Sequence, residues 1–73
     1  MSSLPSIGSR ECIVALERAG FHFKRQEGSH VIMRRDQPFA QTVVPVRKTL
    51  PKGTLRSILR QAGLSVDEFL NLL

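Results

Sequence analysis

The sequence predicts a small α+β domain with the element order α-β-β-β-α. A three-stranded antiparallel sheet should carry its helices on one face, and a short extra helix should follow at the C-terminus. Apolar residues have helical spacing near both ends of the chain and alternate with polar residues in between. A length of 73 residues with 41% hydrophobic content allows one small domain with a core. We expect residues 8–73 to form that domain and residues 1–7 to be a flexible leader.

The first helix is predicted at about residues 10–19. Its apolar stripe consists of Cys12, Ile13, Leu16 and Ala19. Ser9 stands where it can cap the helix start, and Gly20 where it can end the helix in a left-handed conformation. Because Cys12 lies within the stripe, we interpret it as a small buried apolar residue rather than a nucleophile.

A hairpin follows this helix. Residues 21–26 alternate apolar and polar, which predicts a strand whose Phe21 and Phe23 face the helices. Gly28-Ser29 suits a tight turn with a positive φ at its first position. The second strand is expected from residue 30 to 34.

The remaining elements have equally local signals. A third strand is predicted at residues 42–46, at an edge or ending near Pro45, because proline cannot donate to a strand ladder. Phe39, before it, is expected in an exposed loop, either packing that loop or stacking on a base. The next helix has an apolar stripe of Leu55, Ile58, Leu59 and Ala62, and Gly63 ends it. Ser65 and Glu68 form a capping box that starts the last short helix.

Charge is distributed unevenly along the chain. The net charge is +5, but residues 24–60 carry nine Lys and Arg side chains against two acids. Such a basic region suggests a polyanionic partner, because contacts with phosphates release counterions and add up. A basic surface that only keeps the protein soluble is the alternative.

Other classes of site find little support. One cysteine excludes an internal disulfide and a Cys-based zinc site, and the two histidines and scattered carboxylates make no metal cluster. No phosphate loop is present, so we expect neither a cofactor nor a metal. With no secretory signal and no apolar run long enough for a membrane span, a cytoplasmic protein is expected.

His30 is the candidate catalytic residue. It follows Gly28 and Ser29 at the mouth of the hairpin, where a small turn leaves room for a ligand. A histidine within a basic region can serve as general acid or base, and an idle strand histidine is the alternative. His22 is interpreted as an exposed strand residue. The expected neighbours of His30 on the two paired strands are Lys24, Arg25, Arg34 and Arg35. The full set of candidate residues for binding a nucleic acid is Lys24, Arg25, Arg34, Arg47, Lys48, Lys52 and Arg56.

Four blocks of residues, in order, resemble the HicA family of bacterial and archaeal toxins. The blocks are Ala19-Gly20-Phe21, Arg25-Gln26-x-Gly28-Ser29-His30, Val43-Val44-Pro45-Val46 and Leu50-x-Lys52-Gly53-Thr54-Leu55-Arg56-x-Ile58-Leu59-x-Gln61-Ala62-Gly63. The resemblance covers residues 8–73. It implies a fold like a double-stranded-RNA-binding domain and an mRNA interferase that a HicB-type antitoxin neutralises. It also implies that His30 is the catalytic histidine. Many relatives have a second histidine where this chain has Arg47, so a scheme using two histidines is excluded here.

The resulting hypothesis is a metal-independent endoribonuclease that cleaves single-stranded mRNA. His30 would take a proton from a ribose 2′-hydroxyl or give one to the departing 5′-oxygen. Candidates for stabilising the phosphate charge are Lys24, Arg25, Arg47 and Lys48. The antitoxin is expected to cover His30 and the basic strands. There are two alternatives to this hypothesis. The first is a non-catalytic RNA-binding module of the same fold, and the second is a module whose basic surface binds only an acidic protein.

Overall fold

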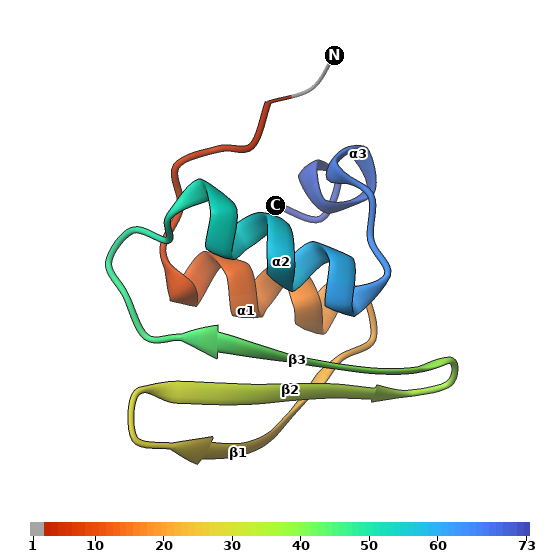
Figure 1. Cartoon of the computed structure of the whole chain (residues 1–73). Helices are drawn as coiled ribbons and strands as arrows, with labels where there is room; N and C mark the ends of the chain where they lie inside the picture. Colours follow the sequence, from red (N-terminus) through yellow and green to blue (C-terminus); the bar gives the residue numbers. More distant parts are fainter. Residues whose placement is uncertain (1–2) are drawn as a thin grey trace.

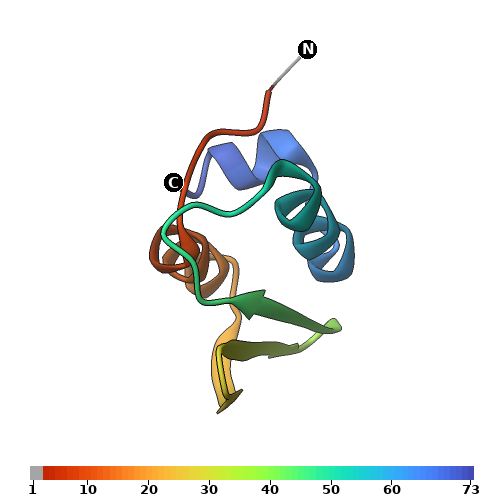
Figure 2. The same ribbon diagram turned by 60° about the vertical axis from the view of Figure 1, so that its left-hand side comes forward.

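A computed structural model describes residues 3–73 and confirms the predicted order of elements (Figure 1). The elements are α1 (Ser9–Arg18), β1 (His22–Glu27), β2 (His30–Asp36), β3 (Phe39–Pro45), α2 (Lys52–Ala62) and α3 (Val66–Leu70). The sheet is antiparallel with the order β1-β2-β3, so β2 is central. Both long helices lie on one side of the sheet, and its other face is left without a helix (Figures 1 and 2).

The core lies between the two long helices and the sheet. The two long helices contribute Cys12, Ala15, Leu16, Leu55, Ile58, Leu59 and Ala62, the sheet contributes Val31, Met33 and Val44, and α3 contributes Phe69. The predicted stripe of α2 is therefore buried throughout, whereas Ile13 and Ala19 of α1 are only half-buried. Cys12 is fully buried, as predicted, and this burial raises the pKa of its thiol to about 12.

The start of α1 differs from the prediction that Ser9 caps it. Gly8 is the N-cap, and Ser9 is the first helical residue. Its hydroxyl donates to the Arg47 carbonyl oxygen over 3.1 Å and accepts from the Arg47 N–H over 3.2 Å. The capping prediction was wrong because a partner 38 residues away in sequence competes for this hydroxyl. The predicted ends of the helices are confirmed, with Gly20 at φ 96° and Gly63 at φ 74°.

The segment before α1 lies on the core. Leu4 is only 4% exposed and belongs to the core cluster. The Leu50 N–H donates to the Ile7 carbonyl oxygen over 2.7 Å, and the Lys52 ammonium donates to the Leu4 carbonyl oxygen. Residues 4–7, which belong to the expected leader, therefore hold the start of α2. Residues 1 and 2 lie outside the described residues.

The strands differ from the predictions in two places. Phe21 is buried as expected, but Phe23 is 55% exposed, so its predicted packing against the helices was wrong. Phe23 pairs with the core residue Met33, yet β1 is the edge strand that lies farthest from the helices (Figure 2). The third strand begins at Phe39 rather than at residue 42, because a tight turn pairs Asp36 directly with Phe39.

The structure confirms the prediction for Pro45 and, in part, the prediction for Phe39. Pro45 is the last residue of β3, which is the other edge strand. Phe39 is 64% exposed as expected, although it lies in a strand and not in a loop.

At the C-terminus, the predicted capping box of Ser65 and Glu68 is present, and it starts α3. Within residues 3–73, every helix is too short or too polar to cross a membrane.

Candidate active site and its basic edge

His30 is the first residue of β2 and lies immediately after the turn of Gly28 and Ser29. Gly28 has φ 59°, as the sequence predicted, so the turn closes without strain. The Ser29 carbonyl oxygen accepts from the Val46 N–H over 2.7 Å, which ties the turn to the residue that follows β3. The imidazole side chain is exposed. His30 thus stands at an open end of the sheet, within reach of a large ligand.

The strand register defines which side chains share a face with His30. Val31 and Met33 belong to the core, and side chains alternate along a strand. His30, Ile32 and Arg34 therefore lie on the face away from the helices. Residues directly opposite one another share a face. We call this set the outer face: Glu27, Arg25 and His22 on β1, His30, Ile32, Arg34 and Asp36 on β2, and Pro45, Val43, Gln41 and Phe39 on β3.

An irregularity in β1 places Arg25 on the outer face. The register shifts between Phe23 and Arg25, so Lys24 is the extra residue of a β-bulge. Arg25 is opposite Ile32, which is only 3% exposed although it lies outside the core cluster. Ile32 is thus covered by its neighbours on the outer face. Lys24 itself is exposed at the bulge.

Two of the candidate RNA-binding arginines are paired with acids on the outer face. Arg25 Nε lies 2.6 Å from Glu27 Oε2, and Arg34 Nε lies 2.9 Å from Asp36 Oδ1. The Arg34 guanidinium also lies over the Phe39 ring, 5.1 Å from its centroid. Exposed pairs of this kind contribute only about 0–1 kcal/mol to stability, so a phosphate can compete for either arginine.

Arg34 is not close to His30. It lies four residues further along β2, at about 3.3 Å per residue, so the two side chains are separated by about 13 Å. Arg35, which we expected beside His30, lies on the helix side, and that expectation was wrong. Its guanidinium stacks over Phe21 at 4.8 Å and donates to the carbonyl oxygens of Pro38 and Ala62. Arg35 therefore joins the sheet to the end of α2, because alternation along the strand turns it inward.

Four other candidate cations follow β3 in the chain. The loop after β3 carries Arg47 and Lys48, both exposed, and α2 begins with Lys52 and carries the exposed Arg56 one turn later. The β1–β2 turn, the end of β3 and the N-termini of α1 and α2 all lie at the same end of the molecule (Figure 1). We call Arg47, Lys48, Lys52 and Arg56 the basic edge.

The backbone of the basic edge is held firmly. The Ser9 N–H donates to the Arg47 carbonyl oxygen over 3.0 Å, in addition to the two bonds of its hydroxyl. The first turn of α2 contains no acid, so the partial positive charge of that helix end adds to the charge of Lys52. This end of the molecule combines a fixed backbone with a positive field beside His30.

Glu27 is a site residue that the sequence analysis missed. It is the cross-strand neighbour of His30, directly opposite on β1. The signal was available, because a two-residue turn at Gly28 and Ser29 pairs the residue before it with the residue after it. The presence of a carboxylate beside His30 changes what this end of the sheet can do chemically.

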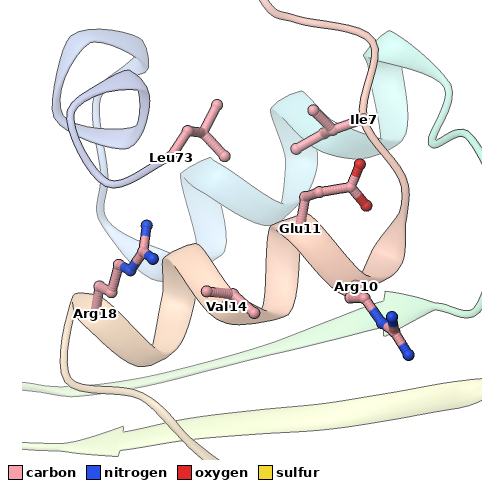
Figure 3. A pocket seen from close by; sticks show the side chains of 6 residues that line it. All are labelled: Ile7, Arg10, Glu11, Val14, Arg18 and Leu73. Carbon is pink, nitrogen blue, oxygen red and sulfur yellow. The ribbon is translucent and has the colours of Figure 1, made fainter.

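A separate groove runs along the outside of α1 (Figure 3). It has a volume of about 380 Å³ and is lined by Ile7, Arg10, Glu11, Val14, Arg18 and Leu73. Arg18 fixes one end by donating to the Leu72 carbonyl oxygen over 2.7 Å. The candidate site residues do not line this groove. Among residues 3–73, no three His, Cys, Asp or Glu side chains are placed to hold a metal ion.

The fold and this site define a small basic α+β domain whose charged edge suits a polyanion. Residues 9–64 match the family described as the HicA toxin of bacterial toxin–antitoxin systems. The chain belongs to this HicA toxin family. Members of the family generally cleave mRNA, and each toxin has a cognate antitoxin. The matched segment runs from α1 through α2 and includes His30 and the whole basic edge. No individual curated protein matches the chain.

Proposed function

We propose that this chain is a metal-independent endoribonuclease that cleaves single-stranded mRNA, with His30 as a general acid or base. The observation that carries the proposal is the position of His30. It is exposed beside the turn of the hairpin, and the Ser29–Val46 hydrogen bond ties that turn to the residue before Arg47 and Lys48. A phosphate bound by that loop would therefore lie next to an imidazole.

The chemistry needs a proton transfer and a stabilised phosphate. The ribose 2′-oxygen attacks the neighbouring phosphorus, and the bond from phosphorus to the 5′-oxygen breaks. The imidazole of His30 moves a proton at one of these two oxygens, a role that typically contributes about 100- to 10,000-fold to the rate. Arg47 and Lys48, with Lys24 and Arg25 on β1, would stabilise the charge on the phosphate oxygens. The products are a 2′,3′-cyclic phosphate and a 5′-hydroxyl.

RNA should extend from the site along the basic edge. Lys52 and Arg56 continue from the loop along α2, and Arg34 extends the positive surface along the sheet. Each phosphate neutralised releases counterions, at a slope of about 0.7 per contact on single-stranded RNA in a plot of log affinity against log salt. A strongly salt-dependent affinity is therefore expected.

The antitoxin belongs to the same proposal. A HicB-type antitoxin that covers His30 and the outer face would exclude RNA directly, and both proteins would act in the cytoplasm. The exposed histidine and the basic edge lie at one end of the molecule, so a single partner surface can cover both (Figure 1).

The test is a cleavage assay on single-stranded RNA in EDTA with three proteins: wild type, His30→Ala and His22→Ala. His22 is the matched control because it is also an exposed histidine of the outer face, opposite Arg34 at the other end of the sheet. We expect wild type and His22→Ala to cut, and His30→Ala to retain RNA in a gel-shift assay without cutting it. Adding the antitoxin should abolish RNA retention by His30→Ala.

Other outcomes decide against the proposal. If all three proteins retain RNA and none cuts it, the chain is a non-catalytic RNA-binding module. If cleavage requires Mg²⁺ or leaves 3′-hydroxyl ends, the mechanism is wrong although the chain is a nuclease. If no protein binds RNA at low salt, the basic edge serves an acidic protein partner.

A further inference from the structure

We propose that Glu27 is a second catalytic residue, acting as the general base on the ribose 2′-hydroxyl while His30 acts as the general acid. This inference rests on the proposed ribonuclease activity and assigns the partner of His30 in that reaction. Arg25 is the positioning residue that holds the Glu27 carboxylate.

The strand register supplies the geometry. Glu27 and His30 are paired Cα partners across β1 and β2, so both side chains leave the same face of the sheet. Directly opposite residues have Cβ atoms about 5 Å apart, a separation at which both side chains can reach one phosphodiester. Both side chains are exposed, so neither has to be uncovered before RNA binds. On the other side of His30 stands Pro45, which has no group that can transfer a proton.

The carboxylate is held in place. Arg25 Nε donates to Glu27 Oε2 over 2.6 Å, and both belong to the outer face. This bond uses one carboxylate oxygen and leaves Oε1 to accept a proton. The guanidinium also offsets the repulsion that a bare carboxylate would exert on a phosphate, and its other N–H groups are donors that can bind a phosphate oxygen.

The other acids among the described residues lie elsewhere. Glu11 and Glu17 are on α1, and Asp67 and Glu68 are on α3, both on the helix side of the sheet. Asp36 is at the opposite end of β2, six residues and about 20 Å from His30. Glu27 is thus the carboxylate whose position in the fold matches that of His30.

The reaction balances with these two groups. Glu27 Oε1 takes the proton of the 2′-hydroxyl as the bond from the 2′-oxygen to phosphorus forms. The bond from phosphorus to the 5′-oxygen breaks, and the imidazolium of His30 gives its proton to that oxygen. The protonated carboxyl and the neutral imidazole then exchange protons with water and return to their starting states. No electron transfer and no further reactant is needed.

The experiment compares Glu27→Gln with Asp36→Asn in single-turnover cleavage of single-stranded RNA. The pairs Arg25–Glu27 and Arg34–Asp36 have the same spacing on the sheet, so Asp36→Asn is a matched control far from His30. We expect Glu27→Gln to cut about 100- to 10,000-fold more slowly, the range for general acid–base catalysis. Its RNA affinity should be equal or higher, because a negative charge is removed from a polyanion site. Asp36→Asn should cut at the wild-type rate.

A second substrate separates the two roles. In an RNA whose scissile 5′-oxygen is replaced by sulfur, the leaving thiolate departs without a proton. This substrate should restore most of the rate to His30→Ala, which lacks the acid, and little to Glu27→Gln, which lacks the base. Restoration of Glu27→Gln and not of His30→Ala would reverse the assignment and overturn the inference.

Failure of the inference is distinguishable from failure of the proposed function. If Glu27→Gln cuts the natural substrate at the wild-type rate while His30→Ala is inactive, the chain is a ribonuclease and Glu27 has no catalytic role. If His30→Ala also cuts at the wild-type rate, the proposed function itself is wrong.

Discussion

Replacing Gly8 with alanine should destabilise this domain, although nothing in the backbone conformation of Gly8 requires glycine. Its φ of −97° and ψ of −177° are extended values that any residue adopts. The requirement comes from a close approach instead. A Cβ on Gly8 would overlap the Lys48 carbonyl oxygen and would lie 3.0 Å from the Arg47 carbonyl oxygen.

The cost follows from the bonds that this approach supports. Ser9 and Arg47 are joined by three hydrogen bonds of 3.0, 3.1 and 3.2 Å. Moving the loop far enough to admit a methyl group stretches all three, and each contributes about 1 kcal/mol. Alanine recovers about 0.4–1 kcal/mol by restricting the unfolded chain. The net loss should be about 2 kcal/mol, or about 10 °C in the melting temperature of a domain this small.

The assay is urea unfolding followed by circular dichroism, with Gly53→Ala as the matched control. Gly53 lies in α2, and a Cβ there would meet nothing within 4 Å. That substitution should therefore raise the free energy of unfolding by about 0.5–1 kcal/mol. If Gly8→Ala unfolds at the same urea concentration as wild type, the packing of the basic edge against α1 has been misjudged.

Three further predictions concern the cap of α3 and the core. Ser65→Ala should cost about 1 kcal/mol, because it removes the cap of α3, and thermal unfolding checks this. Hydrogen bonds from the Ser65 backbone and side chain lower the pKa of Glu68, so its ionised form favours the folded state above the ordinary pKa of about 4.3. Glu68→Gln should therefore be less stable than wild type at pH 7, and the difference should disappear as the pH falls through the lowered pKa. Equal stability at neutral pH would contradict this. Cys12, with a pKa raised to about 12, should react with a thiol reagent at pH 8 about 1,000-fold more slowly in the folded protein than in urea, and rapid native labelling would show that the core opens.

The elements that the sequence predicted well are those whose causes lie within a few residues. The capping box joins Ser65 to a residue three positions away, and Gly63 ends α2 by its own φ. The turn at Gly28 needs only a positive φ at one residue. The position of His30 beside the turn of the hairpin followed from that signal, and the family resemblance then marked this histidine as the candidate for catalysis.

The surroundings of His30 were predicted less well, because they depend on register and on contacts distant in sequence. Arg34 and Arg35 are adjacent in the chain, yet one lies on the outer face and the other joins the sheet to α2. Composition alone treats both as members of one basic region. Glu27 was overlooked for the opposite reason: it counted as an offset to the positive charge until pairing placed it opposite His30.

By itself, the sequence determined the order of helices and strands, the core stripes of the helices and the hairpin that presents His30, because periodicity and turn chemistry are local properties. The tertiary structure decided three other matters. Ser9 bonds to Arg47 rather than capping α1, Phe23 stays exposed on an edge strand that the helices do not reach, and the cations divide between the outer face, the basic edge and the helix side. These outcomes depend on which segments, 20 to 40 residues apart, come into contact when the helices pack on the sheet, and no short-range pattern in the chain records that.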